Sequence, residues 1–313
     1  MSEIRVQAPG LLTTVQDLGR EGFGLLGVSP SGAADPISLR LGNRLVGNSH
    51  GAAALEMTLL GGEFLFPQGA IIALTGSDFG ATLDGMPLDP SIAVDARPGQ
   101  TLRFGSTRSG ARCYLCVQGG IVVEPFLGSA STHLLSGLGG YEGRALRKND
   151  VLHIGPEIAP FQKTTIASRA LEHLSPRKVL RVTRGPQSDW FPESSVETFY
   201  AGTYRVAEES NRMGLRLQGK PVPRDSGGEM ITEGVSIGAV QITTGGLPII
   251  LFVEQQTTGG YAKIANVICA DLHSLGQLRP RDEIRFEQVA WETARSLLRE
   301  QEKLLASEDL ISG

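Results

Sequence analysis

The chain has 313 residues, of which 40 are Gly and 17 are Pro, so Gly makes up about 13% against about 7% in an average protein. This excess predicts many tight turns and excludes a helical bundle or coiled coil, because Gly weakens helix interiors. The 29 basic and 33 acidic residues give a net charge of −4, with no block of five like charges, which excludes nucleic acid and membrane surfaces as main partners.

The distribution of apolar residues predicts a cytoplasmic protein with two domains. No apolar run approaches the roughly 20 residues of a membrane span, and the first residues lack the basic-then-apolar order of a signal peptide. Three cysteines do not form a disulfide framework, which agrees with a reducing compartment. At 41% apolar residues the chain can bury a full core, and its length exceeds what one core organises.

The first 155 residues are predicted to form one β-rich domain, a sandwich or barrel, because short β segments alternate with Gly. The predicted strands cover Ile4–Gln7, Ala53–Leu60, Glu63–Phe66, Ala70–Leu74, Thr101–Phe104, Ala111–Val117 and Val151–Ile154. One helix interrupts them: Asp35 caps it, Pro36 starts it and Gly47 ends it. We expect this helix to plug or cover the mouth of a barrel.

Residues 156–177 are predicted to connect this domain to a second β-rich domain, residues 178–287. Its predicted strands cover Val179–Thr183, Tyr204–Ala207, Leu215–Leu217, Gly238–Thr243, Pro248–Val253 and Glu283–Phe286, with short helices near Glu193–Phe199 and Asp271–Leu278. The last part, residues 288–313, is predicted to be a C-terminal helix and tail, because apolar residues recur there at helical spacing.

One short sequence is echoed between the two halves. Residues 97–104, RPGQTLRF, resemble residues 279–286, RPRDEIRF, 182 positions later. Each is a Pro-led turn that enters an apolar strand. The echo fits either two related barrels or one common way of entering a hairpin.

Several motifs lack the context that their chemistry needs. Residues 22–27 fit G-x-G-x-x-G but continue into a loop, and the two G-x-S-x-G matches, at residues 47–51 and 234–238, do not join a strand to a helix. Cys113 and Cys116 lie in a predicted strand, where they would point to opposite faces, so we interpret them as buried thiols. The five His residues are scattered, and no Walker loop occurs, so neither a metal site nor a phosphate loop is predicted.

Three segments stand out as candidate binding loops because amides, hydroxyls and charged groups are placed between glycines. The first carries Gln16, Asp17 and Arg20, where the alternative is that Asp17 and Arg20 pair locally to shape a turn. The second, residues 209–219 with Arg184 before it, carries Arg212. The third has Gln241 on one strand and then a loop after the apolar strand of residues 248–253, which contributes Gln256, Thr257, Thr258 and Gly260. For the third segment the alternative is that its Gln and Thr residues cap ordinary turns.

In these segments the sequence resembles the biotin-dependent carboxyltransferase family in its C-type form, which includes the C-type chain of 5-oxoprolinase, allophanate hydrolase subunit 2 and the antagonist of a sporulation-kinase inhibitor. The resemblance runs from residue 13 to about residue 286 in family order. It is carried by TTVQDLGREG, GAAD, NRLVGN, AALEMTLLGG, ALTGSDF, LCVQGGI, the LGS and GGYEGR pieces, VTRGP, SNRMGLRLQG, GAVQI and QQTTGGYAKIANVICADLHSLGQLRP.

The resemblance implies a mainly β fold with two cyclophilin-like β-barrel domains, a few short helices and a C-terminal helix. It also implies a hetero-oligomer with a B-type partner, similar to allophanate hydrolase subunit 1, and an A-type partner that completes an ATP-dependent 5-oxoprolinase. The sequence departs from the family at four positions: Glu254 stands where Asp is frequent, Ala262 and Thr243 where Pro is common, and Arg281 where Gly is usual. These departures affect substrate choice more than fold.

Under this resemblance the first hypothesis is that the chain acts in hydrolysis of the lactam of 5-oxoproline to L-glutamate. Such a reaction needs cations near developing negative charge, amides that recognise the lactam and carboxylates that move protons. We assign Arg20, Arg184 and Arg212 to anion binding. Gln16, Gln241, Gln256, Thr257 and Thr258 are assigned to amide recognition, and Gly260 to close backbone approach of the ligand. Asp17, Asp35 and Glu56 are the acid or base candidates.

Two other functions stay open. The chain could be a carboxyltransferase module that acts on urea or allophanate, in which case biotin must come on another chain, because no Met-Lys pair for biotin attachment occurs. It could also be a regulatory partner of a B-type kinase inhibitor, without turnover.

Overall fold

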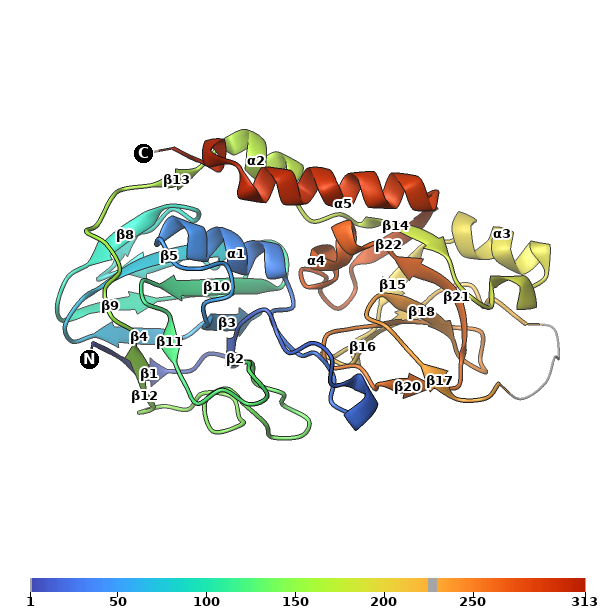
Figure 1. Ribbon diagram of the computed structural model, residues 1–313, viewed down its shortest axis with the longest axis horizontal. Coiled ribbons are helices and arrows are strands. Elements are labelled where there is room, and N and C mark those ends of the chain that lie inside the picture. Colours follow the sequence, from blue (N-terminus) through green and yellow to red (C-terminus); the bar gives the residue numbers. More distant parts are fainter. Residues whose placement is uncertain (1, 225–229, 313) are drawn as a thin grey trace. The chain divides into compact units, whose positions relative to one another are not determined.

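The computed structural model describes residues 2–224 and 230–312, which form two compact units (Figure 1). Unit 1 comprises residues 1–20, 31–174 and 304–313, and unit 2 comprises residues 21–30 and 175–303, apart from the residues outside the described ranges. Residues 21–30 therefore belong with unit 2, whereas the sequence-based division placed them in the N-terminal domain.

Unit 1 is built from two β-sheets. The larger sheet has the strand order β11-β12-β1-β4-β9-β6-β7 and the smaller one β2-β3-β10-β5-β8. The bounds in the larger sheet are β1 Glu3–Ala8, β4 Glu63–Phe66, β6 Thr82–Leu83, β7 Met86–Pro87, β9 Gln100–Arg103, β11 Ile121–Val122 and β12 Val151–Ile154. Those in the smaller sheet are β2 Leu12–Gln16, β3 Ala54–Thr58, β5 Ala70–Gly76, β8 Ala93–Ala96 and β10 Arg112–Val117.

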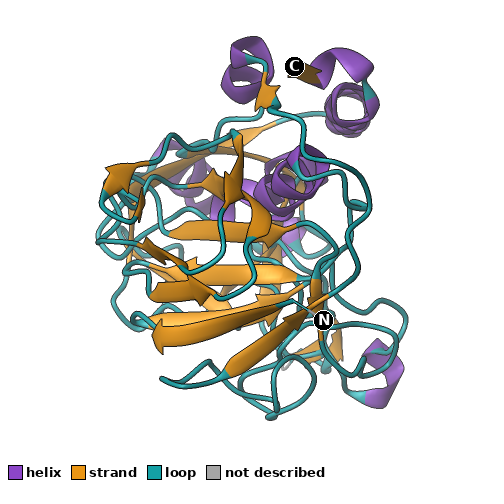
Figure 2. Ribbon diagram, turned by 90° about the vertical axis from the view of Figure 1, so that its left-hand side faces the viewer, coloured by secondary structure: helices purple, strands orange, loops and turns teal. Residues whose placement is uncertain are grey.

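The core of unit 1 lies between these sheets, because alternate side chains of each strand point inward. Phe64 and Phe66 of β4 pack there with Leu55 and Met57 of β3, and none of the four is exposed to solvent. Figure 2 shows the strands in layers, with helices outside them. Because alternate residues of β4 are buried, the sequence pattern of this strand was enough to predict its bounds correctly.

Helix α1 (Pro36–Leu45) covers the outer face of the smaller sheet, where Ile37, Leu41 and Leu45 pack against Tyr114 and Cys116. The expectation that it covers a barrel mouth was therefore wrong. Its predicted start is confirmed, since Asp35 caps the helix by accepting a hydrogen bond from the backbone N of Ser38 at 2.9 Å, and Pro36 is its first residue.

The two thiols of strand β10 confirm the expected alternation. Cys113 belongs to the core between the sheets, and Cys116 to the cluster beneath α1. Both are free and buried, and burial raises the pKa of each thiol. They therefore act as small apolar side chains.

Unit 2 contains a closed barrel with the strand order β14-β21-β18-β19-β16-β15-β22, which β14 and β22 close as a parallel pair. The bounds are β14 Val179–Arg184, β15 Tyr204–Val206, β16 Gly214–Gln218, β18 Ala239–Ile242, β19 Pro248–Leu251, β21 Ala262–Val267 and β22 Glu283–Gln288. This barrel and the mainly β composition of the chain confirm the predicted fold class.

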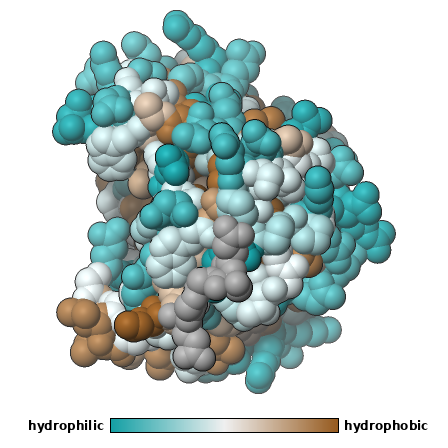
Figure 3. Space-filling model, turned by 90° about the vertical axis from the view of Figure 1, so that its right-hand side faces the viewer, coloured by the Kyte–Doolittle hydropathy of each residue, from teal (hydrophilic) through white to brown (hydrophobic). Residues whose placement is uncertain are grey.

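One face of unit 2 is largely polar. Figure 3 shows hydrophilic residues over much of the face that it presents, with hydrophobic residues gathered at one lower edge. The large apolar residues of unit 2 that are most exposed are Leu25, Ile231 and Leu26, at 101%, 88% and 73%. Single exposed apolar residues of this kind are normal on the surface of a folded protein.

Short elements complete the structure. The helices besides α1 are α2 Ser168–His173, α3 Glu193–Ala201, α4 Leu272–Leu275 and α5 Trp291–Ala306, with 3₁₀ turns at Gly24–Leu26, Ser188–Trp190, Cys269–Asp271 and Glu308–Leu310. Two small ladders join β13 Thr165–Ile166 to β23 Ile311–Ser312, and β17 Glu233–Gly234 to β20 Thr258–Gly259. In the described ranges no helix is long and apolar enough to cross a membrane.

The echoed sequences form the same turn in both units. The backbone N of Gln100 donates to the carbonyl of Arg97, and that of Asp282 donates to Arg279, both at 3.1 Å. The residue before each donor is left-handed, with φ +84° at Gly99 and +73° at Arg281. The shared conformation accounts for the echo, because both segments turn into a strand in the same way.

Candidate functional site: a polar cavity in unit 2

An open cavity of about 910 Å³ lies in unit 2, within the size range of small-molecule sites. One part of its wall is the segment of residues 22–27, and another is the short β17–β20 ladder. The lining residues are Gly22, Gly24, Leu25, Gly27, Pro186, Glu233, Gly234, Val235, Ser236, Thr257, Thr258, Lys263 and Asn266. Hydroxyl, amide and charged groups thus meet an open space large enough for a small ligand.

Lys263 is the buried cation of this cavity. Its side chain is 4% exposed, and its Nζ lies 2.6 Å from Oε1 of Glu233, whose side chain is 46% exposed. Gln187 Nε2 donates to the same Oε1 at 2.9 Å. These two contacts hold the pKa of the Glu233 carboxyl below its usual range.

The backbone holds both side chains in place. Gln187 accepts a hydrogen bond from the backbone N of Lys263 through Oε1, and its own backbone N donates to the carbonyl of Lys263, each at 3.2 Å. Lys263 itself lies on β21, in the barrel wall. The ammonium and the amide are therefore preorganised, whereas Glu233 sits on an exposed strand of two residues.

Two predicted amides, Gln241 and Gln256, lie close to Gly259, which follows the cavity-lining Thr258. Gln241 lies opposite Lys263 in the β18–β21 register and is 1% exposed. A Cβ built on Gly259 would lie 2.6 Å from Nε2 of Gln241 and 3.2 Å from Nε2 of Gln256, so only Gly permits this close approach. Gln241 Nε2 has no hydrogen-bond partner among the described residues.

The other predicted residues of unit 2 have different surroundings. Thr257 and Thr258 line the cavity, and Gly260 follows them closely in sequence without lining it. Arg212 is buried and its Nε donates to Oε1 of Glu254, which is also buried. Arg184 Nε donates to the hydroxyl of Ser188 at 3.2 Å. Neither arginine lines the cavity, and their assignment to anion binding stays a prediction.

In unit 1, Gln16, Asp17 and Arg20 converge on the segment of residues 126–132. Gln16 is the last residue of β2, in a segment that was expected to be a loop, and its Nε2 donates to the carbonyl of Thr132. Asp17 accepts hydrogen bonds from the backbone N of Ala130 and from the hydroxyls of Ser129 and Ser131. Arg20 donates to the carbonyls of Phe126 and Ser131. The three side chains therefore fix the conformation of the loop of residues 126–132.

Asp35 and Glu56 meet at the start of α1. Glu56 is 2% exposed and its Oε2 accepts from the backbone N of Ala34 at 2.8 Å and from the hydroxyl of Tyr114 at 2.6 Å. Burial, followed by the charges of Glu56 and Asp35, raises the pKa of Tyr114, which keeps its hydroxyl a donor. Asp35 caps α1, so both carboxylates have structural partners, and their role as acid or base stays a prediction.

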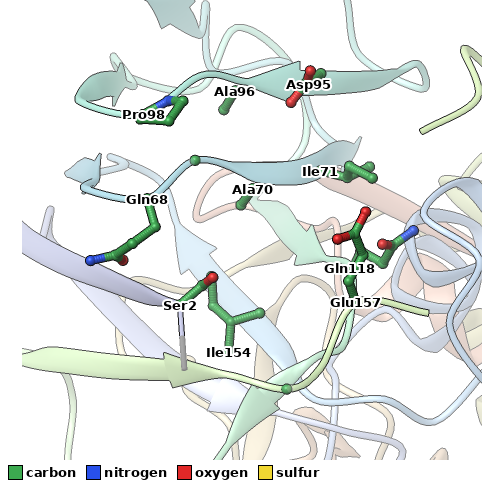
Figure 4. A pocket seen from close by; sticks show the side chains of 12 residues that line it. Ser2, Gln68, Ala70, Ile71, Asp95, Ala96, Pro98, Gln118, Ile154 and Glu157 are labelled. Atoms are coloured by element: carbon green, nitrogen blue, oxygen red, sulfur yellow. The ribbon is translucent and has the colours of Figure 1, made fainter. Parts of the chain in front are cut away.

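Unit 1 has a second, smaller cavity of about 210 Å³ (Figure 4). Gln118 and Glu157 lie together on one side of it, and Gln68 and Ser2 on the other. Gln118 Nε2 donates to the carbonyl of Val46 at 3.2 Å, so its amide is already engaged. Within residues 2–224 and 230–312, no cluster of three or more His, Cys, Asp or Glu residues could hold a metal ion.

Lys263, Glu233 and Gln187 were not predicted from the sequence. The signal for Lys263 was a lone lysine in the apolar run that follows Gly259 and Gly260. That run was not predicted as a strand, although it is β21. Glu233 and Gln187 have no such signal, because they reach the lysine from segments 30 and 76 positions away (263 − 233 and 263 − 187).

Comparisons with known proteins agree with this architecture. The carboxyltransferase domain, subdomain A and B, matches residues 26–288. The C-type chain of the 5-oxoprolinase of Escherichia coli K12 is 37% identical over 300 residues, which cover 96% of each chain. The urea amidolyase of Saccharomyces cerevisiae is 37% identical over 328 residues, which cover 98% of this chain but 18% of that protein.

Among solved structures, the K. lactis urea amidolyase has a TM-score of 0.90 and 34% identity. The similarity covers 99% of this chain and about a fifth, 21%, of that much longer chain. The family match to residues 26–288, together with 37% identity to a relative of which 96% is covered, establishes the family. This chain belongs to the family of carboxyltransferase domains, subdomains A and B.

Proposed function

We propose that this chain is the C-type component of an ATP-dependent 5-oxoprolinase, which acts with A-type and B-type partner chains to hydrolyse the lactam of 5-oxoproline to L-glutamate. The observation that carries the proposal is the 37% identity to the corresponding chain of a known 5-oxoprolinase, over 96% of both chains. A relative of matching length supports a shared role better than one in which this sequence is a small part.

The unit 2 cavity supports the same reaction class. 5-Oxoproline has a planar amide and a carboxylate, and the cavity offers the hydroxyls of Ser236, Thr257 and Thr258 together with the Lys263 ammonium. An unstrained lactam is a poor electrophile, so phosphorylation of its oxygen by ATP would create a leaving group before water attacks. In this proposal ATP is used by the complex, with no Walker loop in this chain.

The test is coexpression of this chain with its A-type and B-type partners, followed by assay of ATP-dependent glutamate release from 5-oxoproline. We expect ADP and glutamate in equal amounts. An intact complex that forms neither product would refute the proposal for this protein.

Gln256→Ala tests the site with little risk to the fold, because Gln256 is exposed. We expect kcat/KM for 5-oxoproline to fall roughly tenfold, which corresponds to the upper end of the net free energy of one hydrogen bond. Full activity would remove Gln256 from the site. Arg20→Ala is a weaker test, because Arg20 is 2% exposed and holds the loop of residues 126–132.

A second candidate is a carboxyltransferase module for urea or a related amide, favoured by the structural similarity to a urea amidolyase. Biotin would then be carried by another chain. Addition of a biotin carboxylase, a biotinylated carrier and urea separates the two functions, since only this candidate predicts carboxylation of urea.

A further inference from the structure

We propose that Lys263 and Gln187 form a carboxylate-binding subsite of the unit 2 cavity, and that Glu233 occupies it until the carboxylate of the substrate takes its place. The proposal rests on the proposed function, because 5-oxoproline carries a carboxylate beside its lactam. It adds the residues that recognise this group and an internal competitor for them.

Glu233 itself demonstrates that a carboxylate fits. Its Oε1 lies 2.6 Å from Lys263 Nζ and 2.9 Å from Gln187 Nε2, close enough for an ion pair and a charge-assisted hydrogen bond. The two nitrogen atoms approach one oxygen from different elements, β21 and the segment after β14. A carboxylate delivered by a ligand would find the same groups in the same positions.

The two partners of the ion pair differ in what separation costs them. The Lys263 side chain is 4% exposed, so its charge needs an anionic partner close by. The Glu233 side chain is 46% exposed and can turn into water, which solvates its charge. When a ligand carboxylate replaces Glu233, the buried ammonium therefore stays paired, and the Glu233 carboxylate moves into solvent, where water solvates its charge.

Gln241 gives a second, independent indication of a ligand. It faces Lys263 across the β18–β21 register, it is 1% exposed, and its Nε2 finds no hydrogen-bond partner in the part of the chain that the structure describes. An amide buried without a partner is costly in a folded protein, unless a bound molecule pairs with it. A substrate carboxylate on Lys263 would bring an acceptor next to this donor.

The experiment measures steady-state kinetics of the assembled three-chain complex with 5-oxo-L-proline. It also measures competitive inhibition by 2-pyrrolidinone, which is the same lactam ring without the carboxylate. The variants are Lys263→Met, which keeps length and removes the charge, and Glu233→Gln, which removes the competitor. Lys220→Met, at an exposed lysine of unit 2, controls for the loss of one positive charge.

In Lys263→Met we expect KM for 5-oxoproline to rise about 10- to 100-fold, the range for a lost contact between a carboxylate and a charged donor. The inhibition constant of 2-pyrrolidinone should change less than about twofold. Glu233→Gln should lower KM for 5-oxoproline, and Lys220→Met should leave both constants unchanged. Lys263→Arg should restore part of the affinity, because it restores the charge.

The outcomes separate this proposal from the function on which it rests. If the wild-type complex turns over 5-oxoproline and Lys263→Met keeps its KM, the subsite is refuted while the function stands. If Lys263→Met weakens the binding of 5-oxoproline and of 2-pyrrolidinone equally, the subsite is also refuted, because Lys263 would then not recognise the carboxylate. A wild-type complex without turnover refutes the proposed function itself.

Discussion

Arg281 holds a left-handed backbone conformation, φ +73°, that ordinarily favours Gly. Relief of that conformation by Gly is worth about 1–2 kcal/mol, and the greater freedom of Gly in the unfolded chain offsets about 0.4–1 kcal/mol of it. Arg281 also pairs with Glu208 at 2.8 Å, but the side chains are 82% and 59% exposed, so this pair contributes at most about 1 kcal/mol. Arg281→Ala loses the same ion pair and keeps the strain.

We therefore expect Arg281→Gly to be more stable than Arg281→Ala by about 1 kcal/mol, or roughly 2–4 °C in Tm. Urea unfolding followed by tryptophan fluorescence measures the difference, since both tryptophans of the chain, Trp190 and Trp291, lie in unit 2 with Arg281. The converse variant is Gly99→Ala, where a Cβ meets nothing within 4 Å and only the backbone resists. It should lose about 1 kcal/mol in unit 1, followed by circular dichroism. A Gly variant at 281 that is no more stable than the Ala variant would show that this turn is not strained.

Two further predictions concern carboxylates. Glu56→Ala should cost about 3–5 kcal/mol of unfolding free energy, because it takes the carboxylate away from buried Arg112 and from the backbone N of Ala34. The control is Glu63→Ala, which should cost less than about 1 kcal/mol, because the Glu63 side chain is 40% exposed. Equal losses of the two variants in urea unfolding would contradict a structural role for Glu56. The pKa of Glu233 is lower in the folded than in the unfolded state, so its pairing stabilises the protein above the ordinary Glu pKa of about 4.3 and is lost as pH falls through the folded value. The stability advantage of the wild type over Glu233→Gln should thus shrink in thermal unfolding as the pH falls below about 5, and a difference that stays constant with pH would contradict this prediction.

Local patterns predicted the parts of the fold that local physics determines. Strand β4 alternates buried and half-buried residues, and the start of α1 has an acidic cap followed by Pro, so both were found at their true positions. Strand β21 was missed because its residues are buried on both faces, which removes the alternation that identifies a strand. The placement of α1 on a sheet face depends on contacts with distant strands, which its own sequence does not encode.

The residues of the candidate site also divide into those that the local sequence predicts and those that depend on distant contacts. The run from Gln256 to Thr258 was predicted from a sharp change of polarity after an apolar strand, and two of its residues line the cavity. Lys263 was missed because a lysine is normally exposed, and its burial requires the distant Glu233 and Gln187. Arg212 was predicted to bind anions from its neighbours in sequence, but a carboxylate 42 positions away accepts its hydrogen bond.

Residues 21–30 determine which fragments of the chain can form the complete cavity. They supply four of its lining residues, while the chain on either side of them, up to Arg20 and from Ser31, belongs to unit 1. A fragment that begins at Ser175 would contain the barrel, Lys263 and Glu233 but would lack this wall. Dissection of the protein at the apparent domain boundary should therefore preserve the ion pair and abolish the binding space, so ligand studies require the uncut chain.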